Sequence, residues 1–199
     1  MINSDSLILT ERAETQLGGI EKCLSKGLIN AVCFYGRAGT GKTSYAMHLG
    51  DEYSSDVRHL DCARKGTNNK LMDELQFIAS SGVLPMNDET KPFNRCYILD
   101  EFHNLPMKDQ CRFKMMIEDY ADLVLFLICL NVSKTKSYEK SVESAIRSRC
   151  EGVSFDIRRD ELESHASKVA KQFPMLSREV ITALLPDMRT ITRKALLAS

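Results

Sequence analysis

The chain has 199 residues, of which 43% are hydrophobic and 27% charged, and its net charge is zero. This length suits one α/β domain with a small appendage, and the balanced charge excludes an overall field that would attract nucleic acid. The apolar run at residues 123–130 is too short to span a bilayer, and the first residues lack signal-peptide features, so we expect no membrane partner. The seven cysteines include no C-x-x-C pair, which favours a reducing compartment. We therefore expect a cytoplasmic location (host cytoplasm if viral, the nucleus not excluded).

Strands alternate with helices along the first three quarters of the chain, which is typical of a parallel sheet covered on both faces. Strands are expected at residues 31–35, 57–60, 96–99, 123–130 and 153–155. Helices are expected at residues 10–26, 42–52, 67–80, 106–120 and 138–148. After residue 156 only helical segments follow, at residues 160–172, 177–184 and 187–197. We therefore predict two units, an α/β domain at residues 1–156 and a small three-helix domain at residues 157–199.

A glycine-rich stretch between the first strand and the second helix fits the phosphate-binding pattern G-x-x-x-x-G-K-[ST]. Its glycines let backbone N–H groups turn toward phosphate oxygens, Lys42 can reach the β- and γ-phosphates, and the Thr43 hydroxyl can bind Mg²⁺. Strand, loop and helix N-terminus occur in the order that an anion site requires. The nucleotide-binding residues expected here are Gly36, Arg37, Ala38, Gly39, Thr40, Gly41, Lys42, Thr43 and Ser44.

Two acidic residues follow the strand at residues 96–99. Asp100 can orient the waters of a Mg²⁺ ion, and Glu101 can polarise an attacking water. Asn131 ends the next buried strand, where its amide can bond the γ-phosphate or the attacking water. Taken alone, the residue is better explained as an asparagine that starts a turn. His103 fits a loop residue better than a proton carrier.

Arg149 lies in a Ser-Arg-Cys triplet at the end of a predicted helix, away from the phosphate loop of its own chain. Two interpretations stay open. Arg149 can be a structural charge at a helix C-terminus, or it can be an arginine finger for the γ-phosphate of a neighbouring subunit.

The acidic pair, the Ser-Arg-Cys triplet and an Asp-Met-Arg sequence at residues 187–189 together resemble AAA+ ATPases. Within that class, residues 28–198 are most similar to the small, ATP-hydrolysing subunits of sliding-clamp loaders, without their collar domain. The resemblance implies a P-loop NTPase fold with a parallel sheet flanked by helices, followed by a three-helix lid. It assigns Asp100 and Glu101 to the Walker B motif, Asn131 to sensor 1, Arg149 to the trans-acting finger and Arg189 to sensor 2.

The same resemblance implies ATP and Mg²⁺ as cofactors and ATP hydrolysis as the activity. The expected protein partners are further copies of the chain or homologous AAA+ subunits, assembled in a ring or spiral. The other expected partners are DNA, either primer–template or single-stranded, and a sliding clamp or a helicase. The family's basic N-terminal segment is not found before Leu7, and residues 60–64 replace its Asn-containing box.

Two other functions remain open. A helicase-loader or transposition-regulator ATPase also binds DNA as an open AAA+ spiral and needs no collar. A scaffold subunit would bind nucleotide without turnover, although every hydrolytic position is filled. Some basic residues lie where they can face DNA phosphates in either case, namely Lys65, Lys70, Lys134 and Lys136.

Overall fold

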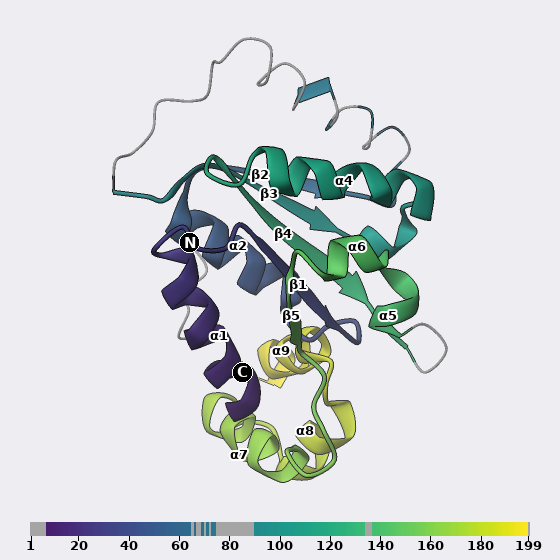
Figure 1. Cartoon of the computed structure of the whole chain (residues 1–199). Helices are drawn as coiled ribbons and strands as arrows, with labels where there is room; N and C mark the ends of the chain where they lie inside the picture. The colour runs from purple at the N-terminus through teal and green to yellow at the C-terminus, as the bar shows by residue number, and fades with distance from the viewer. Residues whose placement is uncertain are drawn as a thin grey trace.

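Five parallel strands form the sheet at the centre of the computed structural model (Figure 1). The strands lie in the order β2-β3-β4-β1-β5, and all their pairings are parallel. They comprise β1 (Ala31–Gly36), β2 (Ser54–Asp61), β3 (Phe93–Asp100), β4 (Val124–Asn131) and β5 (Glu151–Ser154). This order brings the carboxyl ends of β1, β3 and β4 next to one another, and ligands of open α/β sheets bind at such an edge.

The structure describes residues 7–64, 66, 69, 71, 73–74, 90–133 and 137–198. Most of the helix expected at residues 67–80 lies outside these ranges. The four lysines that we considered for DNA contact lie outside them too, namely Lys65, Lys70, Lys134 and Lys136. Within the described ranges, no helix has the length and the apolar character needed to cross a membrane.

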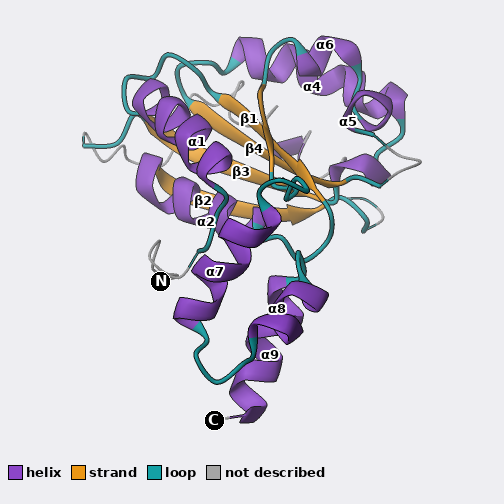
Figure 2. Ribbon diagram, turned by 90° about the horizontal axis from the view of Figure 1, so that it is seen from below, coloured by secondary structure: helices purple, strands orange, loops and turns teal. Residues whose placement is uncertain are grey.

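Helices cover both faces of the sheet (Figure 2). Helices α1 (Glu11–Leu24) and α2 (Lys42–Tyr53) pack on one face, and α4 (Met107–Asp119) packs on the other. Helix α1 begins where Thr10 accepts a hydrogen bond from the N–H of Ala13, at 3.3 Å. One face of α1 is buried, and seven consecutive residues of β4 are buried, as expected for a central parallel strand.

The three helical segments expected after residue 156 are present as α7 (Leu162–Gln172), α8 (Arg178–Leu184) and α9 (Met188–Ala198). They have a small apolar core of their own, formed by Ala166, Val169, Ile181 and Ile191. Figure 1 shows these helices below the sheet, with α9 next to the ends of β1 and β5. The helical unit therefore faces the sheet edge at which the glycine-rich loop begins.

One predicted helix is wrong. The helix expected at residues 138–148 is two short ones, α5 (Tyr138–Ser141) and α6 (Ser144–Arg147). Between them Val142 is extended and buried, because its side chain packs into the core next to α4. The carboxylate of Glu143 then caps α6 by accepting a hydrogen bond from the N–H of Ala145, at 2.7 Å. Burial of the Val142 side chain thus interrupts a segment whose sequence pattern predicts one continuous helix.

Strand boundaries also differ from the sequence prediction. Strand β2 spans eight residues instead of four, and β3 begins three residues earlier than expected. These two strands pair in register from Ser54 opposite Phe93 to Asp61 opposite Asp100. Backbone pairing extends both strands beyond their apolar residues. The pattern of apolar residues alone therefore does not predict where these strands begin and end.

Candidate nucleotide-binding site

The glycine-rich loop joins β1 to α2 and wraps the N-terminus of that helix. Gly39 and Gly41 have φ values of 80° and 89°, a conformation that favours glycine. Gly41 is the N-cap of α2 and offers no side-chain hydrogen bond to the first turn. The N–H groups at this helix end, together with the helix dipole, can therefore bind an anion.

Lys42 lies at the floor of this loop with a residual exposure of only 6%. Its Nζ donates hydrogen bonds to the carbonyl oxygens of Gly36, at 3.0 Å, and Arg37, at 2.7 Å. Burial lowers the pKa of Lys42, and nearby carboxylates, including Asp100, oppose that shift. The ammonium group is thus held by backbone oxygens that a phosphate can replace.

Thr43 and Asp100 meet beside the loop. The Thr43 hydroxyl donates to Asp100 Oδ2 at 3.0 Å, and His59 Nε2 lies 3.4 Å from the same oxygen. Burial raises the pKa of Asp100, but hydrogen bonds from His59, Thr43 and the N–H of Glu101 bring it below its usual value. The hydrogen bond to Asp100 raises the pKa of His59.

This pair of oxygens fits Mg²⁺, which usually takes one or two protein ligands and completes its shell with water and substrate phosphates. The described part of the chain contains no group of three or more His, Cys, Asp or Glu side chains placed to hold a metal. His59 was not expected at the site from the sequence. Only the pairing of β2 with β3 brings it there, because that pairing places His59 opposite Ile98, two residues before Asp100.

Glu101 and Asn131 lie side by side at the ends of β3 and β4. The Asn131 amide nitrogen donates to Glu101 Oε1 at 2.7 Å. His103 contacts both residues. Its Nε2 is 3.3 Å from Glu101 Oε2, and its Nδ1 accepts from the backbone N–H of Asn131 at 3.4 Å. The interpretation of His103 as a simple loop residue therefore missed these two contacts.

A cleft of about 550 Å³ joins these groups, which is within the usual size range of ligand sites. The glycine-rich loop, the acidic edge, the segment 7–9 and helix α9 all contribute to its lining. The predicted site residues that line it are Ala38, Gly39, Thr40, Gly41, Lys42, Thr43, Ser44, Asp100, Glu101, Asn131 and Arg189. Gly36 and Arg37 lie just behind it, where their carbonyls hold Lys42.

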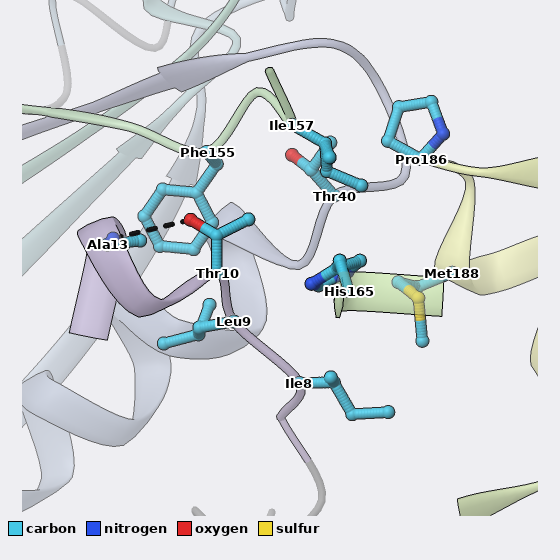
Figure 3. A pocket seen from close by; sticks show the side chains of 10 residues that line it. All are labelled: Ile8, Leu9, Thr10, Ala13, Thr40, Phe155, Ile157, His165, Pro186 and Met188. Atoms are coloured by element: carbon cyan, nitrogen blue, oxygen red, sulfur yellow. Dashed lines mark hydrogen bonds between the residues drawn. The ribbon is translucent and has the colours of Figure 1, made fainter. Parts of the chain in front are cut away.

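A small pocket of about 10 Å³, enough for one water molecule, adjoins the cleft at Ile8, Leu9, Thr40 and Met188 (Figure 3). His165 of α7 lies in the middle of this pocket and is 4% exposed. Within the described part of the chain, its Nδ1 has no hydrogen-bond partner. Burial, followed by the charge of Lys168, lowers the pKa of His165. This imidazole therefore lies in the small pocket beside the cleft and does not line the cleft itself.

Arg149 is the one predicted site residue that lies away from the cleft. Its Nε donates to Glu118 Oε1 of α4 at 2.8 Å, and its Nη1 donates to the carbonyl of Ala145 at 2.7 Å. The side chain is 27% exposed. The guanidinium group is therefore partly exposed and bonded to α4 and to α6.

The glycine-rich loop contacts the helical unit directly. The N–H of Met188 donates to the carbonyl of Gly39 at 3.0 Å, and Asp187 caps α9 by accepting from the N–H of Thr190 at 3.1 Å. A Cβ atom on Gly39 would clash with Asp187 Oδ1 and lie 2.9 Å from its Cγ. A side chain at this position would therefore force the Asp187 carboxylate to move.

We expect Gly39→Ala to loosen the contact between the loop and α9. Gly27→Ala is the matched control, because Gly27 also has positive φ, at 63°, but no atom lies within 4 Å of the place that its Cβ atom would take. In both variants an alanine in the left-handed region costs about 1–2 kcal/mol. Only Gly39→Ala should also increase proteolysis and hydrogen exchange in α9. Equal exchange of α9 in the two variants would show that the close approach to Asp187 has no effect.

Comparisons with known proteins agree with this geometry. No protein-family model matches the chain. It is 28% identical over 150 residues to a protein of Acanthamoeba polyphaga mimivirus named as a replication factor C small subunit, covering 68% of this chain and 38% of that protein. It is 31% identical over 145 residues to replication factor C subunit 3 of Schizosaccharomyces pombe, covering 66% of this chain and 36% of that protein.

Among solved structures, the replication initiator DnaA bound to AMPPCP and single-stranded DNA has a TM-score of 0.61 at 19% identity, covering 97% of this chain and 63% of that one. A RuvB variant of Thermotoga maritima has a TM-score of 0.58 at 16% identity, covering 89% and 56%. The fold is thus that of AAA+ P-loop ATPases. Within this class, the homologues of the chain are replication factor C small subunits, and the chain spans little more than a third of their length.

Proposed function

We propose that the chain is a clamp-loader-like AAA+ ATPase of DNA replication. It binds ATP with Mg²⁺ in the cleft and hydrolyses it at subunit interfaces, which drives assembly of a partner on DNA. The division proposed here is an α/β nucleotide-binding domain at residues 1–156 and a lid at residues 157–199. The observation that carries the proposal is the meeting of Thr43, Asp100, Glu101 and Asn131 beside the buried Lys42.

Each residue has a defined task in this proposal. Lys42 exchanges the carbonyls of Gly36 and Arg37 for the β- and γ-phosphates. Thr43 and Asp100 would hold Mg²⁺, and the ion would supply positive charge to offset charge on the phosphate oxygens. Glu101 accepts the proton of the attacking water, and Asn131 fixes the position of that carboxylate.

Two arginines complete the proposed site from different sides. Arg189 lines the cleft and would bind the γ-phosphate of its own subunit, which couples the nucleotide to the position of the lid. Arg149 lies outside its own cleft and would act on a neighbouring subunit.

The base of the nucleotide would lie toward the other end of the cleft. Leu7, Ile8 and Met188 form an apolar lining there, and the neutral His165 lies next to it in the adjoining pocket.

The function is tested by measuring ATP turnover with three sets of partners. The first is primer–template DNA with a sliding clamp, the second is single-stranded DNA with a helicase, and the third is no partner. We expect the largest stimulation with the first set. Stimulation only by the second set would support the helicase-loader alternative, and tight ATP binding with no turnover under any condition would support a scaffold. A parallel series with Lys42→Ala, which should not bind ATP, measures contaminating ATPase.

A further inference from the structure

His103 bridges the ends of two strands in the candidate site. It lies in the short 3₁₀ helix Phe102–Asn104, and its side chain is 13% exposed. One ring nitrogen contacts the carboxylate at the end of β3, and the other contacts the backbone at the end of β4. The ring therefore spans the gap between Glu101 and Asn131.

The chemistry of these two partners defines one state of the ring. A backbone N–H can only donate, so Nδ1 must be the unprotonated acceptor for Asn131. A proton on Nε2 would then face the Glu101 carboxylate across the 3.3 Å contact. A neutral imidazole with the proton on Nε2 satisfies both contacts, and a cationic ring would lose its bond to the backbone of Asn131.

Glu101 needs such support more than most side chains. Its backbone has φ 55° and ψ 34°, in the left-handed region that residues other than glycine seldom adopt. Its carboxylate is 37% exposed. Asn131 fixes Oε1 alone, which leaves the second oxygen free to turn toward solvent. The contact of His103 Nε2 with Oε2, at 3.3 Å, limits this freedom.

We propose that His103 is a positioning residue, which holds the Glu101 carboxylate at both oxygens and in fixed register with Asn131. The inference rests on the proposed function, because it takes Glu101 to be the base that accepts the proton of the attacking water. Misplacement of a reacting group by about 1 Å can cost 100-fold in rate. His103 should therefore act on the rate of turnover and not on the affinity for ATP.

Three substitutions separate the two contacts. His103→Gln keeps an amide donor near the place of Nε2, His103→Asn keeps an acceptor near the place of Nδ1, and His103→Phe keeps neither. We expect His103→Phe and His103→Asn to lower kcat by roughly 10- to 100-fold with KM within twofold of the wild type, and His103→Gln to restore most of kcat. His48→Phe on α2 is the matched control, and it should leave both constants unchanged.

A measurement without nucleotide or metal tests the same contacts. In ¹⁵N spectra of the imidazole rings, the signal lost in the His103 variants should be that of a neutral ring with its proton on Nε2. Protonation on Nδ1 would overturn the inference, as would a wild-type kcat in His103→Phe or equal losses in His103→Gln and His103→Phe. If Glu101→Gln itself keeps full turnover, the assignment of the base is wrong. If it loses turnover while the His103 variants do not, only the role of His103 is wrong.

Discussion

Replacement of Glu101 by glutamine should lower ATP turnover by about 10²–10⁴-fold, the usual contribution of a general base, while ATP affinity stays unchanged. Glutamine retains the shape of the side chain and an oxygen that accepts the Asn131 amide. It cannot accept a proton from water. Steady-state turnover and equilibrium ATP binding, measured on the same preparation, separate these two effects.

Glu52→Gln is the matched control for this substitution, because Glu52 is exposed on α2 and does not line the cleft. It should behave as the wild type. Unchanged turnover in Glu101→Gln would mean that another group accepts the proton, and loss of ATP binding would mean that Glu101 supports the site structurally.

Arg149→Ala should bind ATP as the wild type does but turn it over about 10³-fold more slowly or worse, as expected for loss of an arginine finger. In its own chain the guanidinium is bonded to Glu118 and to the carbonyl of Ala145, outside the cleft. A role there would be structural, and a surface pair of this kind contributes only about 0–1 kcal/mol to stability. Turnover measured at several protein concentrations should rise with assembly in the wild type and much less in the variant.

Glu118→Ala distinguishes the two roles of Arg149. It removes the ion pair but leaves the guanidinium in place, so its turnover should stay near that of the wild type. If Glu118→Ala is as slow as Arg149→Ala, the ion pair is what matters and Arg149 is not a finger.

Mixing the Arg149→Ala and Glu101→Gln proteins then tests action across an interface. Some interfaces in the mixture combine an intact arginine from one subunit with an intact base from the other. Part of the activity should therefore return. No recovery, in mixtures that demonstrably assemble together, would place the effect of Arg149 within its own subunit or in the fold alone.

Local signals in the sequence predict the sheet and much of the cleft lining. The glycine-rich loop needs particular residue types at fixed spacing, and a strand that ends in acidic residues delivers them to the carboxyl edge. These two features depend on neighbours in the chain. The bond between Asn131 and Glu101 also needs β3 and β4 side by side, and residue patterns indicate only that both strands end in polar residues.

The remaining features depend on contacts between segments far apart in the sequence. The bond of His59 to Asp100 requires the register of β2 on β3, which residue patterns do not specify. The close approach of Gly39 to Asp187 requires the placement of α9 against the loop. The break at Val142 arises because one side chain is buried next to α4, although the surrounding residues favour a continuous helix.

Equilibrium binding of ATP by the wild type and by Lys42→Ala tests the nucleotide site most directly. Lys91→Ala is the matched control, because Lys91 also donates to two backbone carbonyls, those of Asp51 and Ser54, but does not line the cleft. Calorimetric titration should detect ATP binding by the wild type and by Lys91→Ala, and none by Lys42→Ala, since that substitution removes the buried ammonium group from the phosphate loop. Equal ATP affinity in the wild type and Lys42→Ala would contradict the assignment of the site.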